Sequence, residues 1–552
     1  MHPPQQRQQL LQQAATTHFD VCIIGGWATG AGCALDAAAR GLKVLLIEKE
    51  DFGAATSSKS TKLIHGGVRY LEQAVKKASL AQYRMVKKAL QERATLLRMA
   101  PHITRPLALI TPCRTWLEGM YYYVGLKLYD FISGRSHLGR SELLGRKKAL
   151  QRIPTLQSRT LYNAVLYYDG QLNDLRFNWA LIATAIKQGA CCINHLAAQG
   201  FEANSQGRLT SLLATDALTG QPLLIKATTF INATGPFADS IRQMANKNLA
   251  PRIQVSRGVH ILLPKHMMPS TNALLIPKTA DGRLIFAIPY QKHLLAGTTD
   301  DPTTLTAQPF GPNPQEVQYL LNYLNDYLDI NAKPSNVTAG FGGLRPLVTA
   351  AGQHTKDLVR DHEIETDPHT GLVSVLGGKW TTFRLMAKDA IDSIAPAFRH
   401  AKPCTTQHIV LEGSVGYSHT TAIHLQQISQ WDHEVVKHLV SLYGTHALAI
   451  GQLAQQQPRL KERIASPMPY TWAELQYVLE YEMAFTLHDI IGRRWGVELA
   501  DWQQALTLAE PVAAFAASWL NWTAAQTQEA ISSYQQHIQH LQHTAGYVGN
   551  SE

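Results

Sequence analysis

The strongest constraint on the fold of this chain is a strand–turn–helix–strand pattern near its N-terminus. Residues 21–24 are an apolar run of the length of a buried parallel strand, and an alanine-rich helical segment, residues 28–40, follows a glycine cluster. A second apolar run, residues 43–47, ends at an acid, Glu48. This order predicts a dinucleotide-binding unit, in which the helix N-terminus offers N–H groups to a pyrophosphate and Glu48 accepts a hydrogen bond from a ribose hydroxyl.

One position of the glycine fingerprint departs from that pattern. The fingerprint G-x-G-x-x-G runs from Gly25 through Gly26 to Gly30, and Trp27 stands where the middle glycine belongs. A glycine there lets the backbone approach the pyrophosphate without an intervening side chain. We therefore expect the fold to form and the nucleotide to bind weakly or not at all.

The length of 552 residues predicts two or three domains, because one hydrophobic core does not grow to that size. With 45% hydrophobic and 17% charged residues the composition is that of a globular protein. No apolar run reaches the roughly 18–20 residues of a membrane span. The Gln-rich residues 1–17 are expected to be a frayed polar tail, with a weak transit peptide as the alternative.

Cysteine usage and charge narrow the function classes. The 6 cysteines show no C-x-x-C spacing, which predicts a reducing compartment and no thiol-ligated metal site. Residues 51–160 carry 20 Lys and Arg against 6 Asp and Glu, an excess of +14 that exceeds the whole-chain value of +10. Such a region suits an anionic membrane surface or substrate, or is simply a solvated helix face. Nucleic-acid binding is not expected, because no recognised module or base-stacking platform is present.

Alternating strand and helix patterns continue to about residue 400, and helical patterns follow. The expected elements are a helix at 68–99, a strand at 107–111, an aromatic stretch at 116–134, a helix at 178–189, a hairpin of 209–214 with 223–227, strands at 229–232, 258–263, 284–290 and 293–298, a helix at 314–328, and a strand, glycine turn and helix at 372–391.

Several longer motifs resemble one family, the flavin-dependent, respiratory glycerol-3-phosphate dehydrogenases. The motifs are TSSKSTKLIHGGVRYLEQA, YYDGQLND, INATGPFADS, AGTTD, GLRPL and GGKWTTFR, together with the N-terminal ATGAGCALDAAARGLKVLLIE. They span roughly residues 18–395 in the order of the family. No D-x-D-x-D-G calcium loop of the eukaryotic members is present, so the chain looks like a bacterial member.

The resemblance implies an α/β fold. It is a Rossmann-like FAD-binding domain of the glutathione-reductase/D-amino-acid-oxidase type, with an inserted β-rich substrate domain and a C-terminal all-α domain. The expected boundaries are a tail at 1–17, an oxidoreductase domain at 18–400 with FAD-binding segments at about 18–110, 160–250 and 340–400 and cap segments at about 110–160 and 250–340, a linker at 401–418 and a helical domain at 419–545.

The resemblance also implies FAD, oxidation of sn-glycerol 3-phosphate to dihydroxyacetone phosphate, and electron delivery to a membrane quinone. In that chemistry the alcohol loses a hydride to flavin N5 and a proton to a base. The implied location is cytoplasmic, peripherally on the inner face of a bacterial cell membrane, and a homodimer is a further possibility. An oxidase that uses oxygen is one alternative, and a flavin-deficient pseudoenzyme or binding protein, suggested by Trp27, is the other.

The reaction needs a base and cations, and the motifs supply candidates. His65 is the candidate base, because imidazole titrates near working pH; a histidine that bonds a loop carbonyl is the alternative. Arg345 and Lys379 are expected to bind the dianionic phosphate, with Arg69 beside them if the chain is helical there. Arg360 and His362 are weaker candidates, since a surface ion pair explains them equally well.

The remaining expected contacts are with the cofactor. The hydroxyl-rich loop after Glu48 is expected to line it, the turn before Thr381 to face the pyrimidine oxygens of the flavin, and the ATG turn to pack on the adenosine half. The residues are Gly25, Gly26, Gly30, Glu48, Thr56, Ser57, Ser58, Thr61, Lys62, Thr234, Gly235, Gly378, Thr381 and Thr382.

Overall fold

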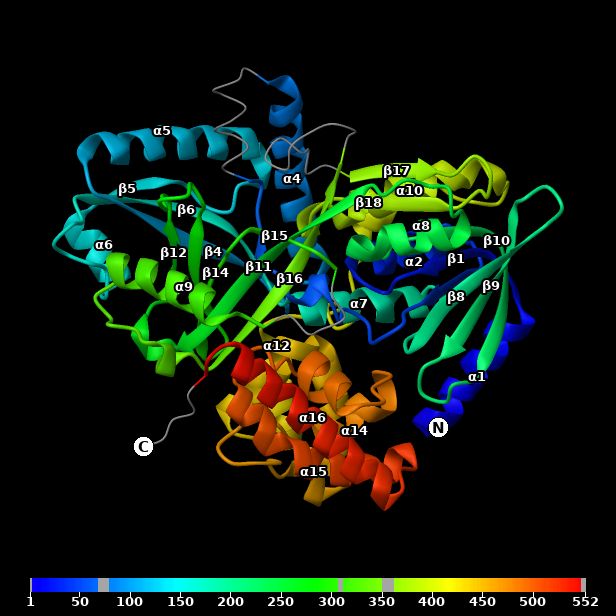
Figure 1. Cartoon of the computed structure of the whole chain (residues 1–552). Coiled ribbons are helices and arrows are strands. Elements are labelled where there is room, and N and C mark those ends of the chain that lie inside the picture. The colour runs from blue at the N-terminus through cyan, green and yellow to red at the C-terminus, as the bar shows by residue number, and fades with distance from the viewer. Residues whose placement is uncertain (1, 68–78, 306–310, 350–361, 548–552) are drawn as a thin grey trace.

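A computed structural model describes residues 2–67, 79–305, 311–349 and 362–547, and Figure 1 shows two sheets side by side above a helical C-terminal part. The first sheet has the order β17-β18-β10-β1-β2-β7, with β8 and β9 added antiparallel beside β10. Its strands are β1 (His18–Ile24), β2 (Val44–Ile47), β7 (Cys191–Ile193), β8 (Leu196–Ala203), β9 (Leu209–Asp216), β10 (Pro222–Asn232), β17 (His362–Thr366) and β18 (Val373–Gly377).

The centre of the first sheet is parallel and covered on both faces, which is why residues 21–24 of β1 and all of β2 are apolar. β1 pairs in parallel with β2 on one side and with β10 on the other, and all four residues of β2 are buried. The covering helices include α2 (Ala28–Ala39), α7 (Asp174–Lys187), α8 (Ala238–Ala245) and α10 (Phe383–Ile394). A Cβ at Gly32 would lie 2.9 Å from the Phe383 ring, so this glycine lets α2 and α10 pack closely.

The second sheet contains strands from four separate parts of the chain. They are β3 (Leu63–Ile64), β4 (Thr104–Cys113), β5 (Glu142–Gly145), β6 (Asn163–Leu172), β11 (Ile253–Pro264), β12 (Ala273–Ile276), β13 (Ile285–Tyr290), β14 (His293–Gly297), β15 (Asp301–Thr303) and β16 (Ala339–Val348). The expected segment boundaries therefore miss where the sheets divide, because β4, β6 and β16 fall in the predicted FAD-binding segments and pair in this sheet. Its helices are α4 (Leu80–Met99), α5 (Trp116–Ser133), α6 (Arg146–Arg152) and α9 (Pro314–Tyr327).

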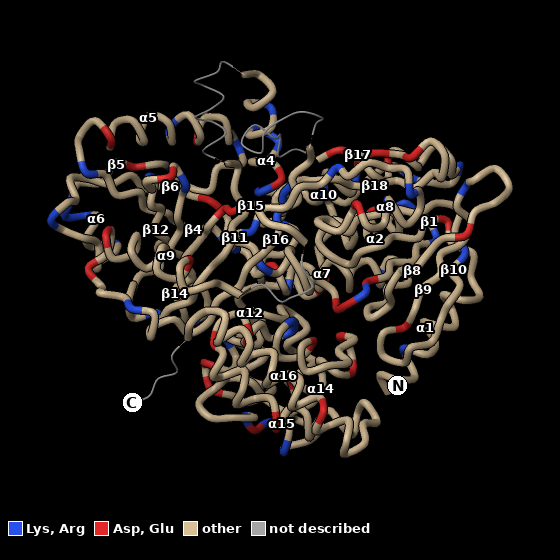
Figure 2. The backbone as a smooth tube through the Cα atoms, in the orientation of Figure 1, with Lys and Arg blue, Asp and Glu red and all other residues tan. Residues whose placement is uncertain are grey.

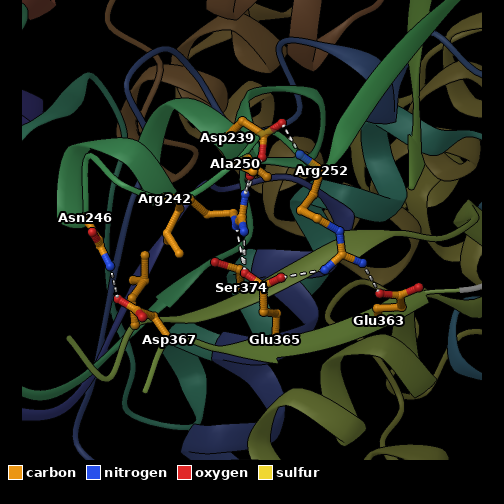
Figure 3. A network of polar contacts seen from close by, with 12 residues as sticks. Asp239, Arg242, Asn246, Ala250, Arg252, Glu363, Glu365, Asp367 and Ser374 are labelled. Atoms are coloured by element: carbon orange, nitrogen blue, oxygen red, sulfur yellow. Dashed lines mark hydrogen bonds and ion pairs between the residues drawn. The ribbon is translucent and has the colours of Figure 1, made fainter. Parts of the chain in front are cut away.

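A polar network joins the start of the second sheet to the first (Figure 3). The Arg242 guanidinium on α8 bonds Glu365 of β17 at 2.6 Å and Asp239 at 2.7 Å. Arg252, just before β11, reaches the other oxygen of Glu365 at 2.7 Å and Glu363 at 2.6 Å. Because these bonds lie where the chain leaves α8 for β11, they fix how the substrate-side sheet departs from the nucleotide-binding one.

The C-terminal part is helical, as predicted, and it lies beneath both sheets in Figure 1. Its main helices are α11 (Thr420–Ser429), α12 (His433–Tyr443), α13 (Ala447–Gln456), α14 (Trp472–Tyr481), the π-helix η11 (His488–Arg494), α15 (Trp502–Leu520) and α16 (Ala524–Thr544). Two buried ion pairs attach it to the rest of the chain: Arg176 with Glu482 at 2.7 Å, and Arg494 with Asp51 at 2.5 Å.

The N-terminus is not the frayed tail that its composition predicts. Residues Pro3–Thr16 form the helix α1, which begins with proline at its first positions, as helices tolerate. Arg7 is buried and its guanidinium lies 2.6 Å from Asp216 and 2.8 Å from the Asn194 carbonyl. Composition alone could not predict this contact between a buried arginine and residues far along the chain.

Candidate functional site

The glycine turn after β1 has the geometry of a nucleotide site. Gly25 has φ +105°, and a Cβ at Gly30 would lie 1.8 Å from the Gly25 carbonyl oxygen, so both positions require glycine. Glu48 Oε2 accepts a hydrogen bond from the Gly26 N–H at 2.7 Å, and Oε1 accepts one from the Glu50 N–H at 3.0 Å. Burial raises the pKa of Glu48 to about 7, although these two amides lower it.

Trp27 occupies the fingerprint position where a nucleotide-binding turn has glycine. It is the N-cap of α2, and its side chain is only 6% exposed. The indole lies toward a second turn, at Thr234 and Gly235 after β10. A Cβ at Gly235 would be 3.4 Å from the indole Cζ3, and the Phe237 ring is 6.0 Å away, edge-on. The side chain therefore lies between the two turns, whereas the surrounding turn, helix and acid fit FAD.

The hydroxyl-rich loop after Glu48 connects the nucleotide turn to both sheets. Ser57 Oγ accepts from the Ala28 N–H at 3.1 Å, and the Ser57 carbonyl accepts from Trp380 Nε1 at 2.9 Å. The Thr56 hydroxyl donates to the Leu344 carbonyl of β16 at 2.8 Å. The loop thus brings together the α2 N-terminus, the turn before α10 and the strand that carries Arg345. Ser58 is fully buried, and its hydroxyl donates to the Ala55 carbonyl at 3.1 Å.

Lys62 has a structural contact in place of the expected cofactor contact. Its side chain is fully buried, and Nζ donates to Asp174 Oδ1 at 2.5 Å and to the Ser58 carbonyl at 2.6 Å. Asp174 Oδ2 also accepts from the Ser60 hydroxyl at 2.7 Å. The pair holds the loop in shape, so only the backbone of Lys62 is left to meet a cofactor. Asp174 was not among the expected residues, although it ends the YYDGQLND motif.

The candidate base lies beside the turn before α10. The His65 N–H donates to Thr381 Oγ1 at 3.3 Å, and the His65 side chain is exposed. Thr381 and Thr382 form a short 3-10 turn, Trp380–Thr382, rather than the first turn of α10. Lys379 Nζ is 3.5 Å from Met85 Sδ.

Of the other expected residues near that turn, the structure describes Gly378 and His362 but not Arg69 and Arg360. Gly378 has φ +96°, which a side chain would strain. His362 pairs with Asp389 at 2.9 Å, the surface ion pair named as the alternative for it. Arg69 and Arg360 lie outside the described residues.

The substrate-side sheet presents an arginine and an unexpected histidine. Arg345 Nη1 lies 2.9 Å from Asp300 Oδ1, and Nη2 donates to Thr298 Oγ1 at 2.9 Å. On the neighbouring strand β11, His260 is 2% exposed, and its Nε2 is 3.0 Å from the Thr61 hydroxyl of the loop. Burial, helped by Arg345 and Lys62, lowers the pKa of His260 well below its usual value, so the ring is neutral.

Sequence reasoning missed His260 because a lone histidine in an apolar strand pattern looks like a core residue. Its ring stacks on Phe341 with centroids 5.1 Å apart, and Nδ1 is buried without a hydrogen bond to any described residue. A Cβ at Gly297 would come within 2.3 Å of the imidazole, so the glycine leaves it room. The signal that could have indicated it is the AGTTD motif, because this motif contains Gly297, the glycine that leaves room for the His260 ring.

The second turn stands across from the first. Thr234 Oγ1 donates to Asn232 Oδ1 at 2.7 Å, and Gly235 has φ +56° and faces the Trp27 indole. Five segments therefore lie close together in the structure. They are the glycine turn, the loop 56–65, the turns at 234–235 and 378–382, and β16. Which of these residues touch a cofactor or substrate stays a prediction.

Comparison with known proteins agrees with this geometry. A family model described as FAD dependent oxidoreductase matches residues 20–392, and one described as C-terminal domain of alpha-glycerophosphate oxidase matches residues 404–527. The chain is 40% identical to the mitochondrial glycerol-3-phosphate dehydrogenase of Macaca fascicularis over 100% of its own length and 77% of that protein. This chain belongs to the FAD-dependent glycerol-3-phosphate dehydrogenase family.

Two further relatives agree with the family assignment. The Arabidopsis thaliana mitochondrial enzyme is 37% identical over 97% of this chain and 88% of its own length. The solved structure of a glycerol-3-phosphate dehydrogenase from Bacillus halodurans, complexed with FAD, has 27% identity and a TM-score of 0.80 and covers 97% of both chains. The predicted family, fold class, enzyme class and cofactor are confirmed.

Proposed function

We propose that this dehydrogenase oxidises sn-glycerol 3-phosphate to dihydroxyacetone phosphate and passes the electrons to a membrane quinone. The observation that carries the proposal is the convergence of the loop 56–65, the turn at Lys379 and the strand of Arg345 beside the nucleotide turn of an FAD-dependent fold. Bound FAD would supply the hydride acceptor there. The test is reduction of a soluble quinone analogue by glycerol 3-phosphate, with FAD in excess. Oxygen uptake that is equally fast without quinone would indicate an oxidase instead.

The side chains of this protein bind the substrate phosphate and remove the hydroxyl proton. Arg345 and Lys379 are the cations that bind and orient the phosphate, which a planar guanidinium can hold with two parallel hydrogen bonds. His65 takes the proton from the substrate hydroxyl, since imidazole is the side chain most often used as a general base and His65 is exposed. Asp300 holds Arg345 in place at 2.9 Å and is itself neutralised by it.

Phosphate recognition by Arg345 gives a test on two substrates. Arg345→Ala should reduce kcat/KM for glycerol 3-phosphate more than tenfold. The reason is that a charge-assisted partner of the phosphate is lost, which costs about 2–5 kcal/mol of binding free energy. Glycerol lacks the phosphate and should lose far less. Steady-state kinetics on both substrates measure the difference, and Arg345→Lys should recover part of it. An equal loss on both would assign Arg345 to structure or flavin.

Peripheral membrane attachment is proposed through α5. No helix in the described part of the chain is long and apolar enough to cross a membrane. On α5, however, an outward stripe at helical spacing is exposed: Leu117, Tyr121, Val124, Leu128 and Phe131, with Phe131 79% exposed. In Figure 1 this helix lies at the outer edge of the second sheet, packed on β6.

Basic residues on α5 and α6 add positive charge to this part of the molecule, with α5 and α6 on opposite faces of β6. Exposed Arg146, Lys147 and Lys148 begin α6, and Figure 2 shows Lys and Arg around it. Lys127 lies over the Tyr123 ring, with Nζ 5.3 Å from its centroid. Arg114, just before α5, pairs with Asp326 at 2.6 Å and adds less net charge. We infer a cytoplasmic enzyme held on the inner face of a bacterial membrane mainly by apolar insertion, with charge assisting.

The α5 stripe can be tested with vesicles. The double variant Leu117→Ser and Phe131→Ser should bind anionic vesicles at least ~100-fold less tightly, since each buried side chain contributes about 1.5–3 kcal/mol. Wild type should stay bound when salt is raised, as apolar insertion is not screened. Ile423→Ser is the matched control, since Ile423 is 52% exposed on α11, outside the stripe. Unchanged binding of the double variant in vesicle sedimentation would remove α5 from the proposal.

A further inference from the structure

A cluster of two histidines and one glutamate lies in the C-terminal part, away from the nucleotide turn. His488 comes from the π-helix η11, Glu498 from the segment before α15, and His537 from α16. His488 Nδ1 is 3.4 Å from Glu498 Oε2, and His537 Nε2 is 3.3 Å from Oε1. One ligand atom from each residue lies within 4.8 Å of the others. Three separate segments thus place three metal-binding side chains together.

The spacing of these atoms matches the coordination edge of zinc. Ligand nitrogens and oxygens lie about 2.0–2.2 Å from Zn²⁺, so a tetrahedral site separates its ligand atoms by roughly 3.3–3.5 Å. The two measured separations, each from one histidine nitrogen to a different oxygen of Glu498, are close to that value. Imidazole with one carboxylate suits zinc and its transition-metal neighbours, whereas Mg²⁺ and Ca²⁺ prefer oxygen ligands alone.

The carboxylate is built into the protein and aimed at the histidines. Glu498 is 3% exposed, and its Oε2 makes no hydrogen bond to any described residue, although His488 Nδ1 is so close. A Cβ at Gly492 would lie 2.7 Å from Oε2, so the glycine leaves the carboxylate its place. The histidine side chains are 34% and 20% exposed, which gives an ion a way in and leaves a fourth position for water.

The charges around the cluster favour an ionised carboxylate but limit the affinity. Burial alone would raise the pKa of Glu498, yet His537, His488 and Arg493 hold it well below its usual value. Arg493 Nη1 lies 3.7 Å from Glu498 Oε1 and repels a cation there. We therefore expect a weaker site than a closed four-ligand one, with the guanidinium stabilising the carboxylate when no ion is bound.

A second cluster of possible metal ligands among the described residues is an ion-pair network instead. Asp51, His195 and Asp489 also place ligand atoms within 4.8 Å of one another. There the Arg494 guanidinium donates to both oxygens of Asp51 at 2.5 and 3.0 Å, and His195 Nε2 donates to Asp489 Oδ2 at 2.9 Å. The bonds satisfy these oxygens, so that cluster is an interdomain contact.

We propose that His488, Glu498 and His537 bind one divalent transition-metal ion, Zn²⁺ best, with water in the fourth position. The ion fastens α16 to η11, and the next residues of η11 include Arg494, which is bonded to Asp51 just after β2. The site therefore stabilises the attachment of the C-terminal part to the nucleotide-binding part. It does not depend on the proposed substrate or electron acceptor.

The test uses the full-length, tag-free chain with FAD added. After dialysis against a chelator, the chain should bind one equivalent of Zn²⁺ by mass spectrometric metal analysis, and its Tm should rise with Zn²⁺ and not with Mg²⁺. Co²⁺ in place of Zn²⁺ should give the intense visible bands of a tetrahedral site. His537→Gln should weaken Zn²⁺ binding by at least ~10-fold, because a ligand is lost.

His540→Gln is the matched control, since His540 is exposed on the same helix. It should keep full metal binding. Glu498→Gln is the second ligand variant, and circular dichroism before metal addition checks that each variant is folded. Wild type without stoichiometric Zn²⁺, or His540→Gln as impaired as His537→Gln, would overturn the site. A folded His537→Gln that binds Zn²⁺ like wild type would overturn it as well.

Discussion

Replacing Trp27 with glycine should raise the affinity of the chain for FAD by about two decades or more. The indole is 6% exposed and lies against Gly235 and Phe237, between the two turns that a dinucleotide must pass. With the indole there, the pyrophosphate cannot approach the α2 N-terminus closely. Losing two charge-assisted hydrogen bonds at about 1.5–3 kcal/mol each lowers the affinity by that amount.

The series Trp27, Trp27→Ala and Trp27→Gly separates steric from other effects. Flavin content from absorbance, and Tm with and without added FAD, should both increase along it, because a tightly bound ligand stabilises the folded state by mass action. The fold itself should not change, since the close contact of Gly30 with Gly25 and of Gly32 with Phe383 does not involve residue 27.

One feature of the indole allows the opposite outcome. Trp27 Nε1 is buried without a hydrogen bond to any described residue, and an acceptor placed beside it would satisfy it. If a phosphate oxygen took that bond, the Trp27 chain would hold FAD as tightly as the glycine variant. Full flavin occupancy in the unmodified chain would show this, and the steric argument would then be wrong.

The parts of the fold that local patterns specify were predictable. Two all-buried strands, a glycine turn and an alanine-rich helix can pack in few other ways, so residues 21–47 fold as expected. The helix predicted at 314–328 is α9, whose Asn313 and Glu316 form a capping box after a recognisable N-cap signal. The hairpin of β9 and β10 follows from a short turn between alternating strands.

What could not be predicted depends on partners far apart in the sequence. Arg7 is an ordinary polar residue until Asp216, more than 200 positions away, meets it. Asp174 is a partner of the loop 56–65 only because β3 and β6 bring Lys62 to it. His260 resembles a core histidine until the loop at Thr61 is folded over it. Such pairings carry no local periodicity. The motifs therefore predict the residues of the candidate site but not the distant residues that support them.

His65→Asn should lower turnover of glycerol 3-phosphate by about 10²–10⁴-fold while flavin content is unchanged. Proton transfer to a positioned base contributes a factor of about this size, and the exposed ring of His65 is accessible to a substrate. Its backbone N–H bonds Thr381, so the segment keeps its anchor when the ring is replaced. Near-normal turnover in this variant would remove His65 from the role.

His260 is the competing base, and a pH profile distinguishes the two. Burial, Arg345 and Lys62 depress the pKa of His260, so its ring is a weak proton acceptor that holds Thr61 at 3.0 Å rather than ionising. With His65 as base, kcat/KM of wild type rises with pH through the pKa of His65, because the protonated ring cannot accept a proton. His260→Asn should keep this acid limb at lower overall turnover, and His65→Asn should abolish it. If instead His260→Asn loses the limb and His65→Asn keeps it, the proton goes to His260, and the buried, neutral imidazole is the base.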